Sequence, residues 1–254
     1  MIHTSSTCRP HALGAGSPSA GVAVEVAQYK IVGGWYWQTS GVELGSQTAG
    51  TWGRGTLRHS FIHNNDDALI LWHSNNSVSD VVIWGGTNGA NIQLGWVPRE
   101  LVHVMVEDVD VIHNLQGWAD AKTNNCVVNA AGLIPGFSVD AHKTLRDVVL
   151  RGITSEGQTL CAVRLAVEMR YLGLTLQDLA VDAWNGLGAA AQESTFHQAD
   201  TAVFIAPAAR VGLLLRNYTV GNDLITLAAD NWQSNKPGRL NFAADMWGYW
   251  SAVP

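Results

Sequence analysis

Apolar residues occur along this chain in short runs that are separated by glycine, asparagine and aspartate, and they rarely recur at helical spacing. From about Val26 onward the runs are rich in valine, isoleucine and leucine and have the length of β-strands. The segment Leu160–Leu172 can be written as an amphipathic helix, but the strand-like runs around it favour strands there too. The pattern predicts an all-β protein.

A short pattern recurs within this alternation: an apolar residue, a polar residue, an aspartate and then a short apolar strand. Its copies are Val78–Ile83, Val106–Val111, Leu145–Leu150 and Leu176–Val181, with a weaker copy at Arg210–Leu215 that has Gly212 in place of aspartate. The four aspartates, Asp80, Asp108, Asp147 and Asp178, are 28, 39 and 31 residues apart. We interpret each as a turn residue. Repeats of about 20 to 50 residues are typical of solenoids, in which each repeat stacks on the next.

A helical solenoid requires pairs of amphipathic helices, and the sequence lacks them. Short Val, Ile and Leu strands with Asn and Gly at the corners favour a right-handed parallel β-helix that covers residues 25–254. A β-sandwich with frequent turns is the alternative. Residues 1–24 are rich in Ser, Gly, Ala and Pro without periodicity, and we predict a poorly ordered N-terminal segment.

Composition narrows the possible functions. Hydrophobic residues make up 47% of the 254 residues and charged residues 14%, which argues against disorder. The net charge of −6 and the lack of a basic stripe argue against nucleic acid or an anionic membrane as partner. No apolar run is long enough to span a bilayer, and the first residues lack the apolar stretch of a signal peptide. The eleven tryptophans either pack in the core or stack on sugar rings.

The three cysteines, Cys8, Cys126 and Cys161, show neither metal-ligand spacing nor a disulfide framework. At most one bridge is possible, and Cys126–Cys161 is the pair we would choose. Sequons at Asn75 and Asn217 are a weak sign of secretion. We find no cluster with metal spacing, no phosphate-binding loop and no Gly-x-Ser-x-Gly elbow, so we expect neither a metal nor a cofactor.

Two adjacent aspartates, Asp66 and Asp67, lie between apolar strands in the segment Ser60–His73. Two nearby carboxyl groups tend to divide into an acid and a base, which is the combination that inverting glycoside hydrolysis requires. Neighbouring side chains on a regular strand point to opposite faces, so both can face one groove only at a bulge or corner. A solvated turn or a calcium site is the ordinary alternative for such a pair.

Several further runs flank this pair in a definite order. They are Trp35–Leu44 before it and, after it, Ile83–Arg99, Val109–His113, Asn125–Ala130 and Asn231–Phe242. In that order and approximate spacing, the runs resemble the β-helix domain of glycoside hydrolase family 49, the dextranases and isopullulanase. The resemblance extends from about Ile31 to the C-terminus. From this resemblance we expect the family's N-terminal β-sandwich and first coils to be absent here, and the stretch at 47–55 to be longer than in the family.

This resemblance implies an inverting endo-hydrolase that cleaves α-1,6 or related links in dextran-like α-glucans. It implies that Asp66 is the general acid and Asp67 the base that activates water. A third family aspartate is replaced here by Ser40, whose hydroxyl cannot act as a carboxylate. Asp67 alone, or another acid such as Glu43, would then activate the water. The resemblance also implies a secreted monomer that needs no cofactor.

Other polar and aromatic residues are candidates for binding sugar. The substrate-binding candidates are His63, Trp37 and, because they match a run that lies beside the cleft in the family, Gln93, Trp96 and Arg99. Further candidates are His73, Asn88, His113 and Lys122. Each also has an ordinary structural interpretation, and Trp232, Arg239 and Trp247 are better explained as closing the end of the helix. Two rival functions remain: a carbohydrate-binding β-helix or inactive fragment without turnover, and a polygalacturonase-like hydrolase. The second would favour a basic cleft, and no Lys or Arg cluster lies near Asp66 in the sequence.

Overall fold

The computed structural model describes a chain of β-strands that form two sheets. The described residues are 11–15, 23–34, 39–44, 54–86, 89–94, 100–113, 127–130, 144–159, 163–165, 170–184, 203–205, 210–225, 240–242 and 247–252. No helix occurs among them.

The first sheet has eight short strands. In spatial order they are β1 (His11–Ala15), β4 (Ser40–Leu44), β6 (Leu69–Ile70), β8 (Ile92–Gln93), β10 (Val128–Ala130), β12 (Val163–Leu165), β14 (Val203–Ile205) and β17 (Leu240–Phe242). We call it the short-strand sheet.

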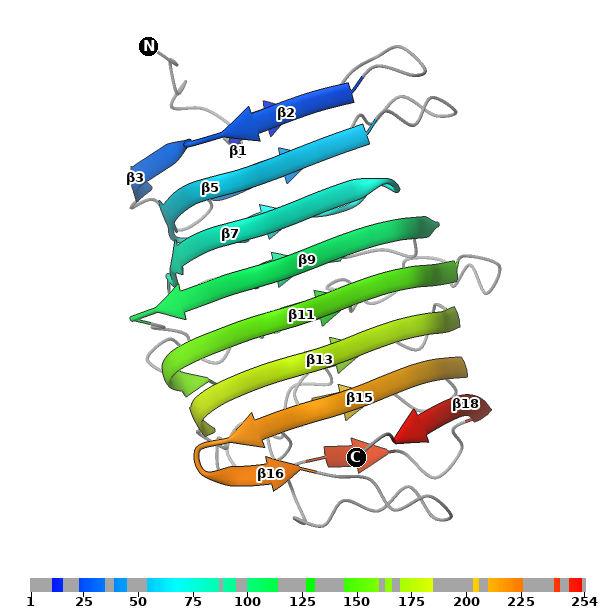
Figure 1. Ribbon diagram of the computed structural model, residues 1–254. Coiled ribbons are helices and arrows are strands. Elements are labelled where there is room, and N and C mark those ends of the chain that lie inside the picture. Colours follow the sequence, from blue (N-terminus) through cyan, green and yellow to red (C-terminus); the bar gives the residue numbers. More distant parts are fainter. Residues whose placement is uncertain are drawn as a thin grey trace, which may run out of the picture.

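The second sheet has ten strands, most of them long. They are β2 (Ala23–Ala27), β3 (Lys30–Gly34), β5 (Arg54–Asn64), β7 (Asn76–Trp84), β9 (Leu101–Ile112), β11 (Thr144–Thr159), β13 (Arg170–Trp184), β15 (Arg210–Val220), β16 (Asp223–Ile225) and β18 (Trp247–Ala252). We call it the long-strand sheet. Its strands lie one above another in chain order (Figure 1).

From β4 to β15 the chain passes alternately from one sheet to the other, so that each coil adds one strand to each sheet. Within the described part every strand pair is parallel except the β15–β16 hairpin. Parallel coils stacked in this way form a parallel β-helix, and the predicted fold is confirmed. The sandwich alternative is wrong, because a sandwich pairs its neighbouring strands antiparallel.

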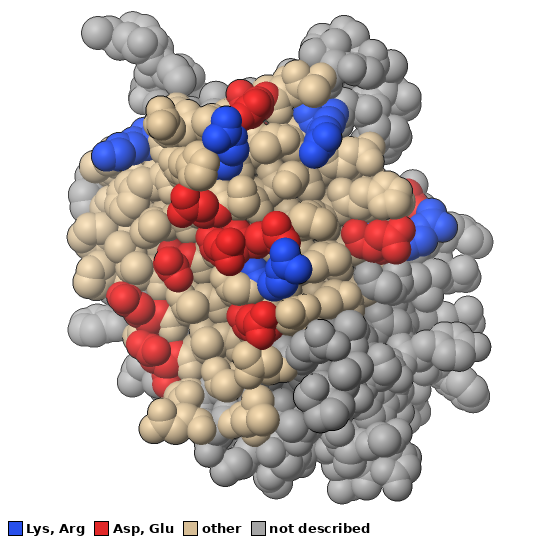
Figure 2. Space-filling view, viewed as in Figure 1, with Lys and Arg blue, Asp and Glu red and all other residues tan. Residues whose placement is uncertain are grey.

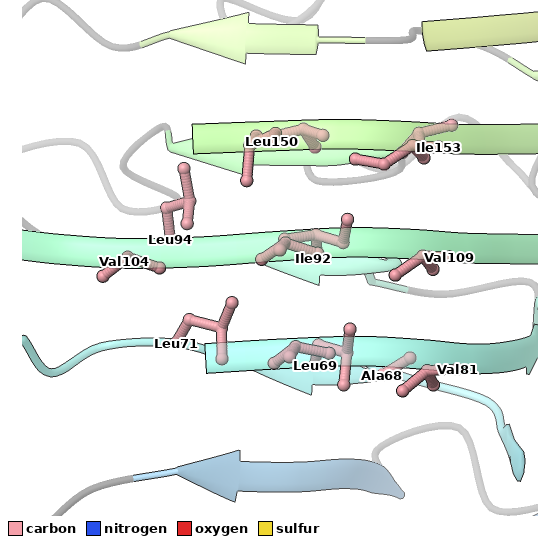
Figure 3. Packing of buried hydrophobic residues seen from close by; sticks show 14 of the residues in the cluster. Ala68, Leu69, Leu71, Val81, Ile92, Leu94, Val104, Val109, Leu150 and Ile153 are labelled. Atoms are coloured by element: carbon pink, nitrogen blue, oxygen red, sulfur yellow. The ribbon is translucent and has the colours of Figure 1, made fainter. Parts of the chain in front are cut away.

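The core fills the space between the two sheets. Val42, Leu69, Ile92 and Val128 lie opposite one another on successive short strands, and all four are buried. Figure 3 shows such rows, with Leu69 next to Ile92 and Leu71 next to Leu94. Because side chains alternate along a strand, the residues between these positions face away from the core.

The long strands bend at residues with left-handed backbone conformation, and these residues form two columns. One column contains His59, Asp80, Asp108, Gly152, Asp178 and Asn217, with φ between 48° and 63°. The other contains Asn75, His103 and Asp147, with φ between 55° and 61°. Asp and Asn adopt this conformation more readily than most residues, which explains why they recur here.

These columns correct the predicted repeat. In the structure Arg151 pairs with Glu107 and Ile153 with Val109, so Gly152, not Asp147, lies opposite Asp108. The copy at Leu145–Leu150 was therefore aligned to the wrong column. The weak copy at Arg210–Leu215 has the same error, because Asn217 is the residue opposite Asp178. All these aspartates lie within long strands rather than in separate turns.

Two further segments can be compared with expectation. Strand β1 lies inside residues 1–24, for which the sequence predicts no ordered element, and it pairs with β4 through His11 and Ser40. Its Gly- and Ala-rich sequence, His-Ala-Leu-Gly-Ala, has no strand-like alternation that would have indicated it. The segment Leu160–Leu172 contains β12 and the beginning of β13, as the preference for strands predicted.

Candidate active site

The two adjacent aspartates lie at a corner between the sheets. Strand β5 ends at Asn64 and β6 begins at Leu69, so Asp66 and Asp67 occupy the connection. The amides of Ala68 and Leu69 donate to the carbonyls of Ala90 and Asn91 in the next coil, at 3.0 and 2.9 Å. Consecutive amides of a regular strand point to opposite sides, so this pattern shows that the chain bends here. The interruption that the sequence argument required is present.

The side chain of Asn64 holds the corner together from inside. Its Nδ2 donates to the carbonyl oxygens of Thr39, Asp66 and Asp67 at 3.1, 2.6 and 3.1 Å. The residue is buried, so these carbonyls obtain from Asn64 the hydrogen bonds that water would give at the surface.

Three glycines from the neighbouring coils pack against this corner. A Cβ atom on Gly41 would lie 2.2 Å from the carbonyl oxygen of Ala68, and one on Gly86 would lie 2.5 Å from Cα of Asn65. A Cβ on Gly89 would lie 2.4 Å from the amide nitrogen of Asp67 and 2.6 Å from Asp66 Oδ1. The glycines let adjacent coils approach the acidic pair more closely than any side chain would allow.

Asp67 is completely buried, and its carboxylate accepts two hydrogen bonds from the next coil. The amide of Ala90 donates to Asp67 Oδ1 at 2.7 Å, and Gln93 Nε2 donates to the same oxygen at 3.2 Å. Gln93 in turn accepts from Asn129 Nδ2 at 3.0 Å. Donors directed at a carboxylate stabilise its ionised form.

Asp66 has different surroundings. It is 8% exposed against 0% for Asp67, and its Oδ1 lies over Gly89, beside an aspartate whose environment favours negative charge. The surroundings of the two carboxyl groups therefore differ: Asp67 Oδ1 accepts hydrogen bonds from the next coil, and Asp66 Oδ1 lies over Gly89.

Ser40 lies directly beside the pair. The carbonyl of Thr39 accepts from the amide of Asp66 at 3.0 Å, and the amide of Gly41 donates to the carbonyl of Asp67 at 2.7 Å. Ser40 stands between these two hydrogen bonds on the preceding coil, and it is buried. The structure thus brings this sequence-predicted position next to Asp66 and Asp67.

A row of residues on the outer face of the short-strand sheet continues from the corner. Glu43, Ile70, Gln93 and Asn129 lie opposite one another on successive strands, between residues that face the core. All four are buried, yet Ile70 does not belong to the core cluster, as expected for the opposite face. Glu43 Oε1 lies 3.7 Å from Nε2 of the buried His73, so a third carboxyl group lines this face.

His63 belongs to an aromatic row at the ends of the long strands. Its ring stacks on Trp84 with centroids 4.7 Å apart, and Trp84 lies 4.9 Å from the tilted ring of His113. Partial burial lowers the pKa of His63 below the usual 6.5. Trp84 is 36% exposed, so the row reaches the surface. His63, at the other end of this stack, precedes Asp66 by three residues in the chain.

The outer face of the long-strand sheet is acidic. Figure 2 shows Asp and Glu gathered over its middle, where Asp80, Asp108, Asp110 and Asp147 are exposed. This face points away from the row of Gln93, because the core lies between the two sheets. Among the described residues no three His, Cys, Asp or Glu side chains are grouped so that they could hold a metal ion. In the same part of the chain, no helix is long and apolar enough to cross a membrane.

Several sequence candidates lie outside the described residues. They are Trp37, Asn88, Trp96, Arg99, Lys122, Trp232, Arg239 and the cysteines Cys8, Cys126 and Cys161. Trp247 lies in β18, and nothing further is described of its side chain. Of the other candidates, the structure gathers Gln93 and Ser40 around the acidic pair and places His63 at the nearby end of β5. Asn129 and Gly89 were not selected from the sequence. For Asn129, a polar residue between the apolar Val128 and Ala130 could have indicated a side chain on the outer face of a strand.

Comparison with known proteins identifies relatives of this chain. Residues 135–253 match the model of glycosyl hydrolase family 49. A dextranase of Arthrobacter globiformis is 32% identical in an alignment of 240 positions, which covers 90% of this chain and 36% of the relative. An isopullulanase of Aspergillus niger is 26% identical over 68% of this chain and 31% of its own length. The chain thus spans about a third of the length of these curated relatives.

A solved structure shows the same fold. Dex49A from Penicillium minioluteum matches with a TM-score of 0.65 at 24% identity, over 89% of this chain and 37% of that chain. A second dextranase, from Arthrobacter sp. strain CB-8, is 33% identical over 88% of this chain and 36% of the relative. The ordered motifs, the β-helix and these relatives agree: the chain belongs to glycosyl hydrolase family 49.

Proposed function

We propose that this protein is an inverting endo-glycoside hydrolase that cleaves α-1,6 or related glucosidic links in dextran-like α-glucans. The observation that carries the proposal is the pair Asp66–Asp67, adjacent in sequence and held at a corner in two different environments. The names of the relatives, dextranase and isopullulanase, support an α-glucan as substrate. An acid and a base on one surface are the minimum that inverting hydrolysis requires.

In this mechanism Asp66 acts as the general acid. Its protonated carboxyl group donates to the glycosidic oxygen as the bond to the anomeric carbon breaks. Asp67 acts as the base that activates the water attacking the anomeric carbon, and hydrogen bonds from Ala90 and Gln93 hold its Oδ1. The ionised form that these donors favour is the form a base requires.

The remaining expectations follow from the substrate. A polysaccharide is too large to enter a cell, so we propose that the protein acts outside the cell. From the family resemblance we propose further that it acts as a monomer and without a cofactor. The glucan would lie over the outer side of the short-strand sheet next to Asp66, the side that the buried residues Glu43, Gln93 and Asn129 line from within. His63 would bind sugar at the edge of this surface, where the aromatic row with Trp84 reaches solvent.

The test is release of reducing sugar from dextran by the wild type and by Asp66→Asn. Loss of a catalytic group lowers kcat by several orders of magnitude, so we expect a fall of at least about a thousandfold. Asp110→Asn is the matched control, because it makes the same change on the opposite, acidic face. Undiminished activity of Asp66→Asn would remove the assignment, and proton NMR of the first product anomer tests inversion.

Ser40 favours one alternative, a carbohydrate-binding β-helix without turnover. It lies beside Asp66 and Asp67 and carries a hydroxyl where the family resemblance places a carboxylate. The alternative predicts that the wild type binds dextran but releases no sugar, and that Ser40→Asp gains turnover. Rapid hydrolysis by the wild type would exclude it.

A further inference from the structure

Three polar side chains from three successive coils form a hydrogen-bonded chain that ends on the candidate base. Asn129 Nδ2 donates to Gln93 Oε1 at 3.0 Å, and Gln93 Nε2 donates to Asp67 Oδ1 at 3.2 Å. All three residues are fully buried. We call this chain the amide relay.

The amide relay has a direction. A glutamine amide donates only through nitrogen and accepts only through oxygen. Because Gln93 directs its nitrogen at Asp67, its oxygen faces the other way and requires a donor. Asn129 supplies that donor, and so it fixes which end of the Gln93 amide faces the carboxylate.

The relay is not a requirement of the fold. Gln93 and Asn129 lie on the outer face, between residues such as Ile92 and Val128 that pack in the core. Ile70 occupies the equivalent position one coil earlier, so an apolar residue can fill this row. Buried amides cost free energy unless they are bonded, which makes their presence next to Asp67 informative.

We propose that Asn129 is a positioning residue of this site: it orients the Gln93 amide so that Asp67 is held as an ionised base. The proposal rests on the proposed function for its catalytic meaning, but the effect on Asp67 itself is independent of turnover. Asn129 does not touch the reacting atoms in this scheme and acts through Gln93.

The decisive variant is Asn129→Asp, which keeps the shape and reverses the relay. The new carboxylate accepts from Gln93 Nε2, so the amide must rotate and direct its oxygen at Asp67. The hydrogen bond from Gln93 Nε2 to the Asp67 carboxylate is then lost, and the Gln93 oxygen repels that carboxylate. Both effects raise the titration midpoint of Asp67, together by about 1 pH unit or more. Asn129→Ala removes the donor without supplying an acceptor, and a smaller rise is expected.

Asn76→Asp is the matched control. Asn76 is also buried, and its Nδ2 donates to the carbonyls of Leu44 and His73 at 3.2 and 2.8 Å, outside the relay. The variant Asn76→Asp therefore loses free energy of unfolding, because buried carbonyls lose their amide donor as they do in Asn129→Asp, while the amide relay is intact. Each aspartate variant adds one buried carboxyl group, at position 129 or at position 76, while the existing titratable groups near this face, Asp66, Glu43 and His73, are unchanged.

The midpoint is measured from the carboxyl carbon-13 resonance of Asp67, assigned by its loss in Asp67→Asn, and the acidic limb of kcat against pH is recorded in parallel. We expect both to move upward in Asn129→Asp and to stay in place in Asn76→Asp, with KM little changed. A midpoint that is the same in all variants overturns the relay. If the midpoint moves in a protein that releases no sugar, the relay stands and the proposed hydrolase function fails.

Discussion

Gly89 offers a quantitative test of how the corner is built. Its φ is +75°, and a methyl group there would lie 2.4 Å from the amide nitrogen of Asp67, about 1 Å closer than ordinary van der Waals contact. In Gly89→Ala the left-handed conformation costs about 1 kcal/mol. The clash with the backbone adds about 1–3 kcal/mol, because the neighbouring coil must move. We expect a total loss of about 2–4 kcal/mol in the free energy of unfolding.

Gly221→Ala separates the two contributions. Gly221 also has positive φ, +56°, but a Cβ there would meet only the carbonyl oxygen of Asp182, at 3.2 Å. This variant should lose about 1 kcal/mol, the conformational part alone. Unfolding in urea measures both losses. Hydrolysis of dextran should fall about a hundredfold in Gly89→Ala, since a shift of about 1 Å misplaces the acid and the base. Equal losses of stability in the two variants would refute the argument.

Two further predictions concern the residues that precede the pair. Asn64→Ala removes the donor shared by three buried carbonyls, and it should cost about 1–3 kcal/mol in urea unfolding; a loss below about 0.5 kcal/mol would contradict the role of this amide. The pKa of His63 is lower in the folded protein than its usual 6.5. Between the folded and the unfolded pKa, the unfolded state therefore binds more protons than the folded state. The free energy of unfolding consequently falls as the pH drops below about 6.5. His63→Gln lacks this contribution, and its stability relative to the wild type should rise between about pH 7.5 and about pH 5; a relative fall would show that the sign is wrong.

The fold and the corner that carries the two aspartates were predictable because they depend on local signals. Short Val, Ile and Leu runs with polar corners indicate stacked strands, and Asn64 before two aspartates indicates a break in the strand. The register of the repeat was not predictable from the same signals. Aspartate suits the left-handed conformation in both columns of bends, so Asp147 and Asp108 look equivalent in the sequence although they belong to different columns.

The partners of the acidic pair were hidden for another reason. Asp67 and Gln93 are 26 residues apart, and Gln93 and Asn129 are 36 apart. No local pattern links residues at these distances, since the separation depends on the length of each connecting loop. Gln93 was selected only through the family resemblance, and its bond to Asp67 became visible once the coils were stacked.

The column of left-handed residues has a consequence for how such a protein can evolve. Neighbouring members are separated by as few as 21 residues, from His59 to Asp80, and by as many as 44, from Asp108 to Gly152. The strands that carry them nevertheless remain in register, so the difference in length falls entirely in the connections. Insertions and deletions can therefore reshape the loops while the frame that holds Asp66 and Asp67 is inherited unchanged. Such a scaffold can acquire new substrate preferences without having to find a new way to fold.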